Sequence, residues 1–290
     1  MTYREAIVSG EKSLGEAGIA DARNDAWLLL TMACKIDHTY YYMHIDEEMP
    51  EELQHEFEVL IKKRAERVPL QYITGEQEFM GMTFHVNSNV LIPRQDTETL
   101  VDRGIVFVKD LPDGTRVLDL CAGSGCIGLA LASQAPQAHV VLGEFSDGAL
   151  RICRQNTRRN ALTGRVIPMT VNALERPDRA LGEFHCIVSN PPYIPHGDIP
   201  GLDHSVKDYE PHLALDGGED GLDFYRAISE KWKAALAPGG RLYFEVGIGQ
   251  ADAVLRIMRA QGFGDIQVVK DHNDIPRVVF GTLCGEVYSE

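Results

Sequence analysis

Hydrophobic residues in the first part of the chain recur at helical spacing. In the segment 50–67, PEELQHEFEVLIKKRAER, the apolar residues Leu53, Phe57, Leu60 and Ile61 fall on one face of a helix. A proline opens this segment, its acidic residues come early and its basic residues come late, as the helix dipole favours. The segment 21–35, DARNDAWLLLTMACK, carries a second apolar stripe. The pattern predicts that residues 1 to about 70 are helical.

The pattern then changes to short apolar runs. Phe79, Met82, Phe84 and Val86, with glycines between them, are typical of a β-hairpin, and we place the joint between two domains here. From about residue 93, apolar strands alternate with helical segments near 126–135, 147–160, 222–236 and 249–261. The strand candidates are 116–120, 139–144, 165–170, 185–190, 240–246, 266–270 and 277–283.

This alternation indicates an α/β fold with a doubly wound, mostly parallel sheet. The last two strands have no helical pattern between them, which predicts an antiparallel hairpin at the end. We therefore divide the chain into a helical domain over 1–75, a hairpin linker over 76–92 and an α/β domain over 93–290.

Composition narrows the classes of function. The 290 residues are 44% hydrophobic with a formal net charge of -15, which argues against a protein that wraps nucleic-acid backbone. There is no targeting segment at the start and no apolar run long enough to cross a membrane, so we expect a cytoplasmic protein with no membrane partner. Cys121 and Cys126 lack the companions of a metal site, and we expect no metal.

One predicted strand ends abruptly in a polar motif. After Ile187 and Val188 come Asn190, Pro191, Pro192 and Tyr193. Proline cannot donate to a strand ladder and keeps the preceding residue extended, so pairing stops here and the carbonyls stay free. Because ligands of open α/β sheets bind beyond the carboxyl ends of strands, the motif is a candidate site.

A glycine-rich turn supplies a second candidate site. In VLDLCAGSGCIGLALA, residues 117–132, the glycines are spaced GxGxxG between a strand and a helix, and Glu144 ends the next strand, where an acid can bind ribose hydroxyls. These features fit NAD and S-adenosylmethionine almost equally. Asp119, which suits the ammonium and sulfonium groups of the methyl donor, favours S-adenosylmethionine when it is combined with the Asn190–Tyr193 motif.

With these residues, the chain resembles the protein-(glutamine-N5) methyltransferases that modify peptide chain release factors. The resemblance extends over nearly the whole length and includes PLQYITGEQEFMGMTFHV at 69–86, VLIPRQDTETLV at 90–101 and YEPHLALDGGEDGLDFYR at 209–226. It implies a Rossmann-like, seven-stranded class I methyltransferase domain, a helical N-terminal domain that recognises the release factor, and methyl transfer to the glutamine of a Gly-Gly-Gln loop.

The resemblance also implies roles for individual residues. The cofactor-binding residues it implies, together with Asp119, are Cys121, Ala122, Gly123, Ser124, Gly125, Glu144, Asn172, Ala173 and Asn190; the substrate-binding residues are Asn190, Pro191, Pro192 and Tyr193. Asn172 stands where the family usually has an aspartate that contacts the adenine amine, and Ala173 stands where an aromatic residue is frequent. Cys121 replaces a glycine, and Glu144 replaces the commoner aspartate.

The chemistry that we expect centres on Asn190, Pro191 and Tyr193. The Asn190 side-chain oxygen and the Pro191 carbonyl each accept one N–H of the substrate amide, and Tyr193 packs on its plane. Glu98 either faces the cofactor or caps the following helix. Two alternatives remain open: an adenine-N6 methyltransferase, which shares the motif but would need a basic face, and an idle protein that only binds a translation factor.

Overall fold

The computed structural model describes residues 1–284, which form two compact units. One unit comprises residues 1–76 with the short segment 203–209, and the other comprises 77–202 and the described residues from 210 on. No helix of residues 1–284 is long and apolar enough to cross a membrane.

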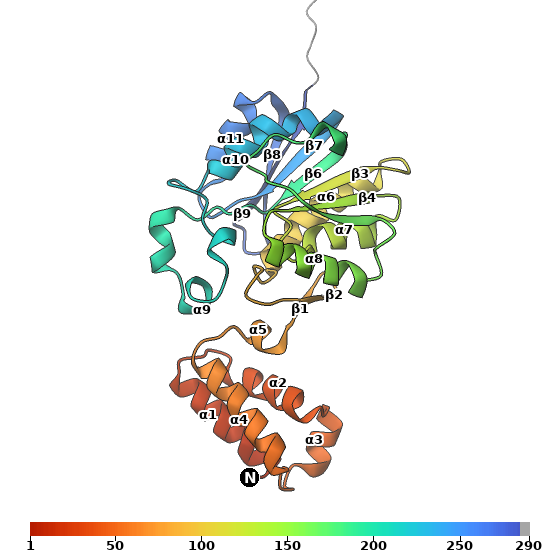
Figure 1. Cartoon of the computed structure of the whole chain (residues 1–290). Helices are drawn as coiled ribbons and strands as arrows, with labels where there is room; N and C mark the ends of the chain where they lie inside the picture. Colours follow the sequence, from red (N-terminus) through yellow and green to blue (C-terminus); the bar gives the residue numbers. More distant parts are fainter. Residues whose placement is uncertain (285–290) are drawn as a thin grey trace, which may run out of the picture. The chain divides into compact units, whose positions relative to one another are not determined.

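The first unit is helical (Figure 1). Its helices are α1 (Tyr3–Glu16), α2 (Ala22–Cys34), α3 (His38–His44), α4 (Glu51–Ala65), α5 (Leu70–Thr74) and α9 (His204–Lys207). Thr2 and Glu5 form a capping box at the start of α1, which satisfies the free N–H groups there. The core joins the predicted stripe, including Phe57, Leu60 and Ile61, to Leu29 and Leu30 of α2. The predicted helical spacing is confirmed.

The hairpin is also confirmed: β1 (Glu76–Phe79) pairs with β2 (Met82–His85). The turn between them uses Met80 and Gly81, both at positive φ. Phe79 and Phe84 are buried and meet edge to face, with ring centroids 6.2 Å apart. Glu98 accepts a hydrogen bond from the Met80 N–H at 3.0 Å, so its carboxylate fixes the hairpin turn.

All seven predicted strands form one sheet in the order β5-β4-β3-β6-β7-β9-β8. The strands are β3 (Arg116–Leu120), β4 (His139–Glu144), β5 (Val166–Thr170), β6 (Phe184–Ser189), β7 (Leu236–Glu245), β8 (Phe263–Lys270) and β9 (Pro276–Leu283). β3 to β7 are parallel, whereas β9 is antiparallel to both β7 and β8, which confirms the predicted terminal hairpin. The chain order reverses at β3, so the crevice of this fold opens beyond β3, β4 and β6.

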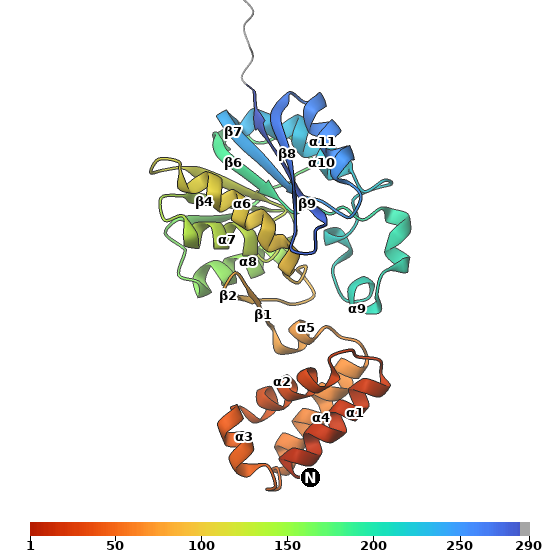
Figure 2. The same cartoon turned by 180° about the vertical axis from the view of Figure 1, so that it is seen from behind.

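Helices cover both faces of the sheet (Figures 1 and 2). They are α6 (Glu98–Lys109), α7 (Cys126–Gln134), α8 (Asp147–Arg159), α10 (Asp223–Lys231) and α11 (Ala251–Ala260). Alternate residues of β3 serve the two faces: Val117 packs in the cluster of α6 and α7, and Leu118 in that of α10 and α11. This is the predicted Rossmann-like α/β architecture.

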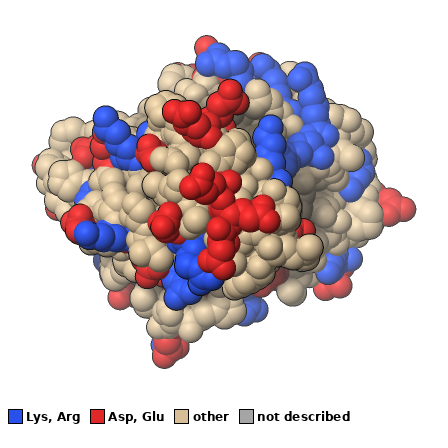
Figure 3. All heavy atoms as spheres, turned by 90° about the horizontal axis from the view of Figure 1, so that it is seen from below, with Lys and Arg blue, Asp and Glu red and all other residues tan. Residues whose placement is uncertain are grey.

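Charge is unevenly distributed on the face drawn in Figure 3, where acidic side chains gather near the centre and basic ones toward the upper right. The excess of 43 acidic over 28 basic residues therefore does not create a uniform negative surface on this face.

Candidate active site

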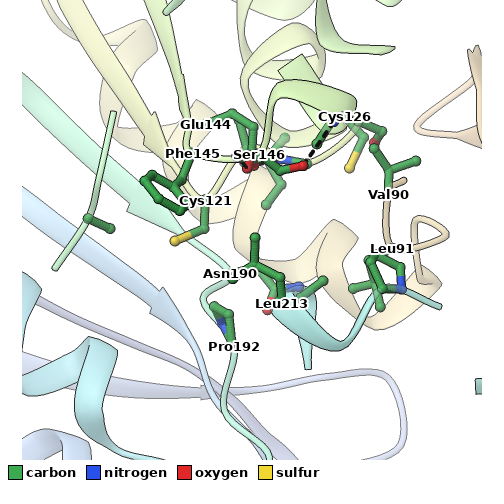
Figure 4. Close-up of a pocket in the computed structure, with 18 of the residues that line it drawn as sticks. Val90, Leu91, Cys121, Cys126, Glu144, Phe145, Ser146, Asn190, Pro192 and Leu213 are labelled. Carbon is green, nitrogen blue, oxygen red and sulfur yellow. Dashed lines mark hydrogen bonds between the residues drawn. The ribbon is translucent and has the colours of Figure 1, made fainter. Parts of the chain in front are cut away.

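A pocket lies in the second unit, where the sheet order reverses. Four segments of its wall lie at the ends of β3, β4, β5 and β6, namely 121–127, 144–149, 171–174 and 190–192, and residues of 89–97 and 211–224 complete it. In Figure 4, Glu144, Phe145 and Cys121 lie on one side, Val90 and Leu91 on another, and Asn190, Pro192 and Leu213 on a third. The pocket thus brings together the two candidate sites predicted from the sequence, the glycine-rich turn and the Asn190–Tyr193 motif.

Nine of the predicted site residues line this pocket: Cys121, Ala122, Gly123, Ser124, Glu144, Asn172, Ala173, Asn190 and Pro192. Four others, Asp119, Gly125, Pro191 and Tyr193, are not part of its wall. Most of the predicted site residues are therefore gathered in one place, and the other four lie within two positions of a wall residue in the chain.

The glycine loop turns tightly before α7. Gly123 and Gly125 have φ of 56° and 81°, and a Cβ on Gly125 would lie 3.0 Å from Cys153 Sγ. At Gly128, a Cβ would lie 2.3 Å from a Leu142 methyl group, so this position packs helix against strand. Cys121 also has a left-handed φ of 61°, which costs a non-glycine residue about 1–2 kcal/mol.

Glu144 holds the glycine loop and borders the pocket. Its Oε2 accepts from Gly123 N at 2.8 Å, and its Oε1 accepts from Ser146 N at 2.7 Å. Each carboxylate oxygen has two lone pairs, so both oxygens keep capacity for a ligand hydroxyl. The residue after it, Phe145, was not predicted; 55% exposed, it offers the pocket a flat apolar face.

Asp119 lies beneath the loop, away from the pocket surface. It is completely buried, and its Oδ2 accepts from Gly128 N at 2.8 Å. Burial raises the pKa of this carboxyl to about 7; the Gly128 hydrogen bond lowers it, and nearby Glu144 raises it. Oδ2 is thus held at the start of α7, whereas Oδ1 has no hydrogen-bond partner among residues 1–284.

Asn172 and Ala173 form the part of the pocket wall that follows β5. Asn172 Oδ1 accepts from Leu174 N at 3.0 Å, and its Nδ2 donates to Glu175 Oε1 at 3.1 Å. The buried Ala173 is fixed through its carbonyl, which accepts from Trp232 Nε1 at 3.0 Å. One lone pair of the Asn172 oxygen remains for an amine donor.

The Asn190–Tyr193 motif leaves the sheet as predicted, since β6 ends at Ser189. Asn190 Nδ2 donates to Thr97 Oγ1 at 3.4 Å, and the Pro191 carbonyl takes part in none of the hydrogen bonds found among residues 1–284. Gln250 Nε2 donates to the Tyr193 carbonyl at 2.8 Å. Burial raises the pKa of the Tyr193 phenol to about 12, so it stays protonated at neutral pH.

The segment after Glu210 supports this motif. Ile194 N donates to Leu215 O at 3.0 Å, and Gly217 N donates to Ile194 O at 2.9 Å, so two stretches run side by side. A Cβ on Gly217 would lie 2.7 Å from Tyr193 Cα. The absence of a side chain at Gly217 permits this close approach.

Two of the motifs that carry the family resemblance meet here. Arg94 of the segment 90–101 and Glu210 of the segment 209–226 form an ion pair, with Nη2 and Oε1 2.6 Å apart. Burial raises the pKa of Glu210, and the Arg94 guanidinium opposes that rise. Arg94 lines the pocket, so this pair ties two of its walls together.

Comparison with known proteins identifies the family. The profile of the PrmC N-terminal domain matches residues 5–75, and that of the methyltransferase small domain matches residues 97–201. A release factor glutamine methyltransferase of Geobacter sulfurreducens is 44% identical over 285 residues, 97% of each chain. This chain belongs to the release factor glutamine methyltransferase family. Another member, from Clostridium acetobutylicum, is 37% identical over 98% of this chain and 100% of its own.

A solved methyltransferase from Pyrococcus furiosus is similar in fold alone: it is 16% identical, with a TM-score of 0.50 over 71% of this chain and 90% of its own. The resemblance inferred from the motifs is confirmed, and the chain is a methyltransferase whose methyl donor is S-adenosylmethionine rather than a nicotinamide dinucleotide.

The pocket fits this donor on its own features. Glu144 has free acceptor capacity for hydroxyl groups, Phe145, Leu174 and Leu213 line the pocket with apolar surface, and the loop at Gly123 leaves room for close backbone approach.

Proposed function

We propose that this protein transfers a methyl group from S-adenosylmethionine to the side-chain amide nitrogen of the glutamine in the Gly-Gly-Gln loop of a peptide chain release factor. The observation that carries the proposal is the meeting of Asn190 and the glycine loop in one pocket, in a chain whose relatives are named release factor glutamine methyltransferases. Because the relatives carry this name, we expect the partner to be a translation protein in the cytoplasm.

The difficulty of the reaction lies in the acceptor. An amide nitrogen shares its lone pair with its carbonyl, the resonance that gives peptide bonds a rotational barrier of about 18–20 kcal/mol. The substrate amide must therefore be oriented and its developing charge stabilised. When bound, S-adenosylmethionine supplies the methyl group on a sulfur that leaves with the electrons of the broken C–S bond.

We assign the orienting role to two oxygens at the end of β6. Asn190 Oδ1 and the Pro191 carbonyl each accept one N–H of the glutamine amide, and Tyr193 packs beside its plane. As the N–C bond forms, positive charge grows on nitrogen, and these oxygens stabilise it more than they stabilise the neutral amide. One of the two amide protons then leaves to water, because the alkylated nitrogen is acidic.

The cofactor side is assigned to the glycine loop and the strand ends that line the pocket. Gly123, Glu144 and Asn172 bind the donor, and Asp119 acts one step away by holding Gly128 and thus the start of α7. Holding donor and acceptor at attack distance can supply about 7–11 kcal/mol, the largest contribution that we invoke. The helical unit is assigned to release factor recognition.

The test is methyl transfer from labelled S-adenosylmethionine to an intact, unmethylated release factor. We expect label in the release factor, none when its Gly-Gly-Gln glutamine is replaced by alanine, and none in an adenine-containing oligonucleotide. Label in the oligonucleotide would instead support an adenine methyltransferase. If this protein shows no heat of binding with S-adenosylmethionine in titration calorimetry, the result would support the alternative of an idle protein that only binds a translation factor.

A further inference from the structure

Glu245 lies next to Asn190, although it was not among the predicted site residues. In the parallel pair of β6 and β7, Ser189 lies opposite Phe244, so the next residues, Asn190 just past β6 and Glu245 at the end of β7, lie side by side. Glu245 is only 2% exposed and is not part of the pocket wall. A carboxylate thus sits directly behind the residue that we assign to the substrate amide.

The contacts of this carboxylate are with the site. Asn190 Nδ2 donates to Thr97 Oγ1 at 3.4 Å, and both of these side chains lie near enough to Glu245 to lower the pKa of its carboxyl. Thr97 is itself buried and lines the pocket. Because an ionised carboxylate only accepts hydrogen bonds, it selects the orientation of Asn190 in which the amide nitrogen faces Glu245 and Thr97. The amide oxygen is then left for another donor.

An ion pair does not account for this carboxylate. The neighbouring cation, Arg277, forms its ion pairs with Asp271 and Asp96, both at 3.1 Å, and none with Glu245 is found among residues 1–284. Within the same described residues, Glu245 Oε2 has no hydrogen-bond partner. A buried carboxylate without an ion pair opposes folding, and an amide of the same shape would serve packing better. We therefore attribute the presence of this buried carboxylate to a function in the active site.

We propose that Glu245 is a positioning residue that fixes the Asn190 amide with its oxygen toward the substrate and, by its negative charge, makes that oxygen a stronger acceptor. The inference rests on the proposed function. Accepting from Asn190 Nδ2 draws the amide toward its charge-separated resonance form, which increases the negative charge on Oδ1. The effect is greatest in the transition state, when positive charge develops on the substrate nitrogen.

The proposal requires that Glu245 is ionised, and the surroundings of its carboxyl set the pH above which it ionises. Burial raises the pKa of Glu245 to about 7, hydrogen bonds from Thr97 and Asn190 together with the charge of Arg277 lower it, and Asp96 raises it. Burial raises the pKa of the other groups that interact with it, to about 12 for Tyr193 and Cys126 and well above its ordinary value for Tyr225, so all three stay protonated at neutral pH. Turnover should therefore increase with pH through about 7.

The decisive variant is Glu245→Gln, which keeps the shape and removes the charge. At saturating release factor and S-adenosylmethionine, we expect kcat to fall about tenfold or more, since charge-assisted hydrogen bonds are about twice as strong as neutral ones. The melting temperature should stay equal or rise. The rise of kcat across neutral pH should be weaker in the variant than in the wild type; the comparison is needed because Asp119 also has a pKa near 7.

A double-mutant cycle separates positioning from structure. If Glu245 acts through Asn190, Glu245→Gln should change kcat by less than about twofold once Asn190→Ala is present. Ser229→Ala is the matched control, because Ser229 Oγ is another buried side-chain atom with no hydrogen-bond partner among residues 1–284 and lies outside the pocket wall. It should match the wild type in kcat.

Three results would overturn the proposal. The first is an unchanged kcat of Glu245→Gln in a preparation whose wild type methylates the release factor. The second is an equal loss of kcat in the wild-type and Asn190→Ala backgrounds. The third is a parallel loss of cofactor affinity and melting temperature. A wild-type protein that transfers no methyl group to a release factor would overturn the proposed function and, with it, this inference.

Discussion

Replacing Gly221 by alanine tests how closely the loop at Tyr193 must be held. Gly221 has φ of 73°, and a Cβ there would lie 2.3 Å from the Tyr193 carbonyl oxygen and 2.7 Å from Gln250 Nε2. Neither neighbour can yield freely, because the first is backbone and the second donates to that same carbonyl at 2.8 Å. The methyl group therefore displaces the segment that carries the substrate motif.

Three costs contribute. Left-handed backbone costs alanine about 1–2 kcal/mol, overpacking about 1–3 kcal/mol, and loss of the Gln250 hydrogen bond about 0.5–1.5 kcal/mol. Part of this energy is relieved by moving the loop, and a misplacement of about 1 Å can slow catalysis about 100-fold. We expect kcat to fall by at least tenfold, while affinity for S-adenosylmethionine changes less than twofold, since Gly221 and Tyr193 do not line the pocket.

Gly239→Ala provides a matched control. Gly239 has φ of 75°, but a Cβ there would meet no atom of the described residues within 4 Å, so only the backbone cost applies. Steady-state kinetics, calorimetric titration with S-adenosylmethionine and thermal melting would be measured on both variants. If Gly221→Ala and Gly239→Ala have the same kcat, close packing behind Tyr193 does not position the substrate, and the reasoning is refuted.

Three further predictions follow from the site. Asn190→Ala should lower kcat by a factor of about 100 to 1,000, by analogy with oxyanion-hole deletions, while cofactor affinity measured by calorimetry changes only a few-fold; equal losses of both would contradict the assigned role. Glu144→Gln should raise the Kd for S-adenosylmethionine at least about tenfold, because a charged acceptor for hydroxyls is lost, and an unchanged Kd would remove Glu144 from the cofactor site. Burial raises the pKa of Asp119 from 3.8 to about 7, so its contribution to stability is present at low pH and is lost as pH rises through 7. In urea unfolding, Asp119→Asn should therefore gain stability relative to the wild type between pH 5 and pH 8. A constant difference would show that Asp119 does not titrate there.

Much of the fold could be predicted because its signals are local. Strands buried on both faces are continuous apolar runs, and the glycines at 123, 125 and 128 mark a turn that only small residues permit. The end of β6 was fixed by two prolines. The family resemblance added which motifs belong to the same site.

What could not be predicted depends on register and on distant contacts. Asp119 alternates onto the face of β3 that packs against α7, and only the formed sheet shows that its carboxylate meets Gly128 instead of the pocket. The Arg94 and Glu210 pair joins residues 116 positions apart. Glu245 becomes a neighbour of Asn190 only through the pairing of β6 with β7. The available sequence signal for Glu245 was an acidic residue at the end of a buried strand.

The most direct measurement is fragment mass spectrometry of an unmethylated release factor after incubation with this protein and S-adenosylmethionine. The account predicts one added methylene on the side chain of the Gly-Gly-Gln glutamine, and its absence when the protein carries Asn190→Ala. A methyl group on any other residue, or an unmodified release factor in the presence of a protein that binds S-adenosylmethionine, would contradict it.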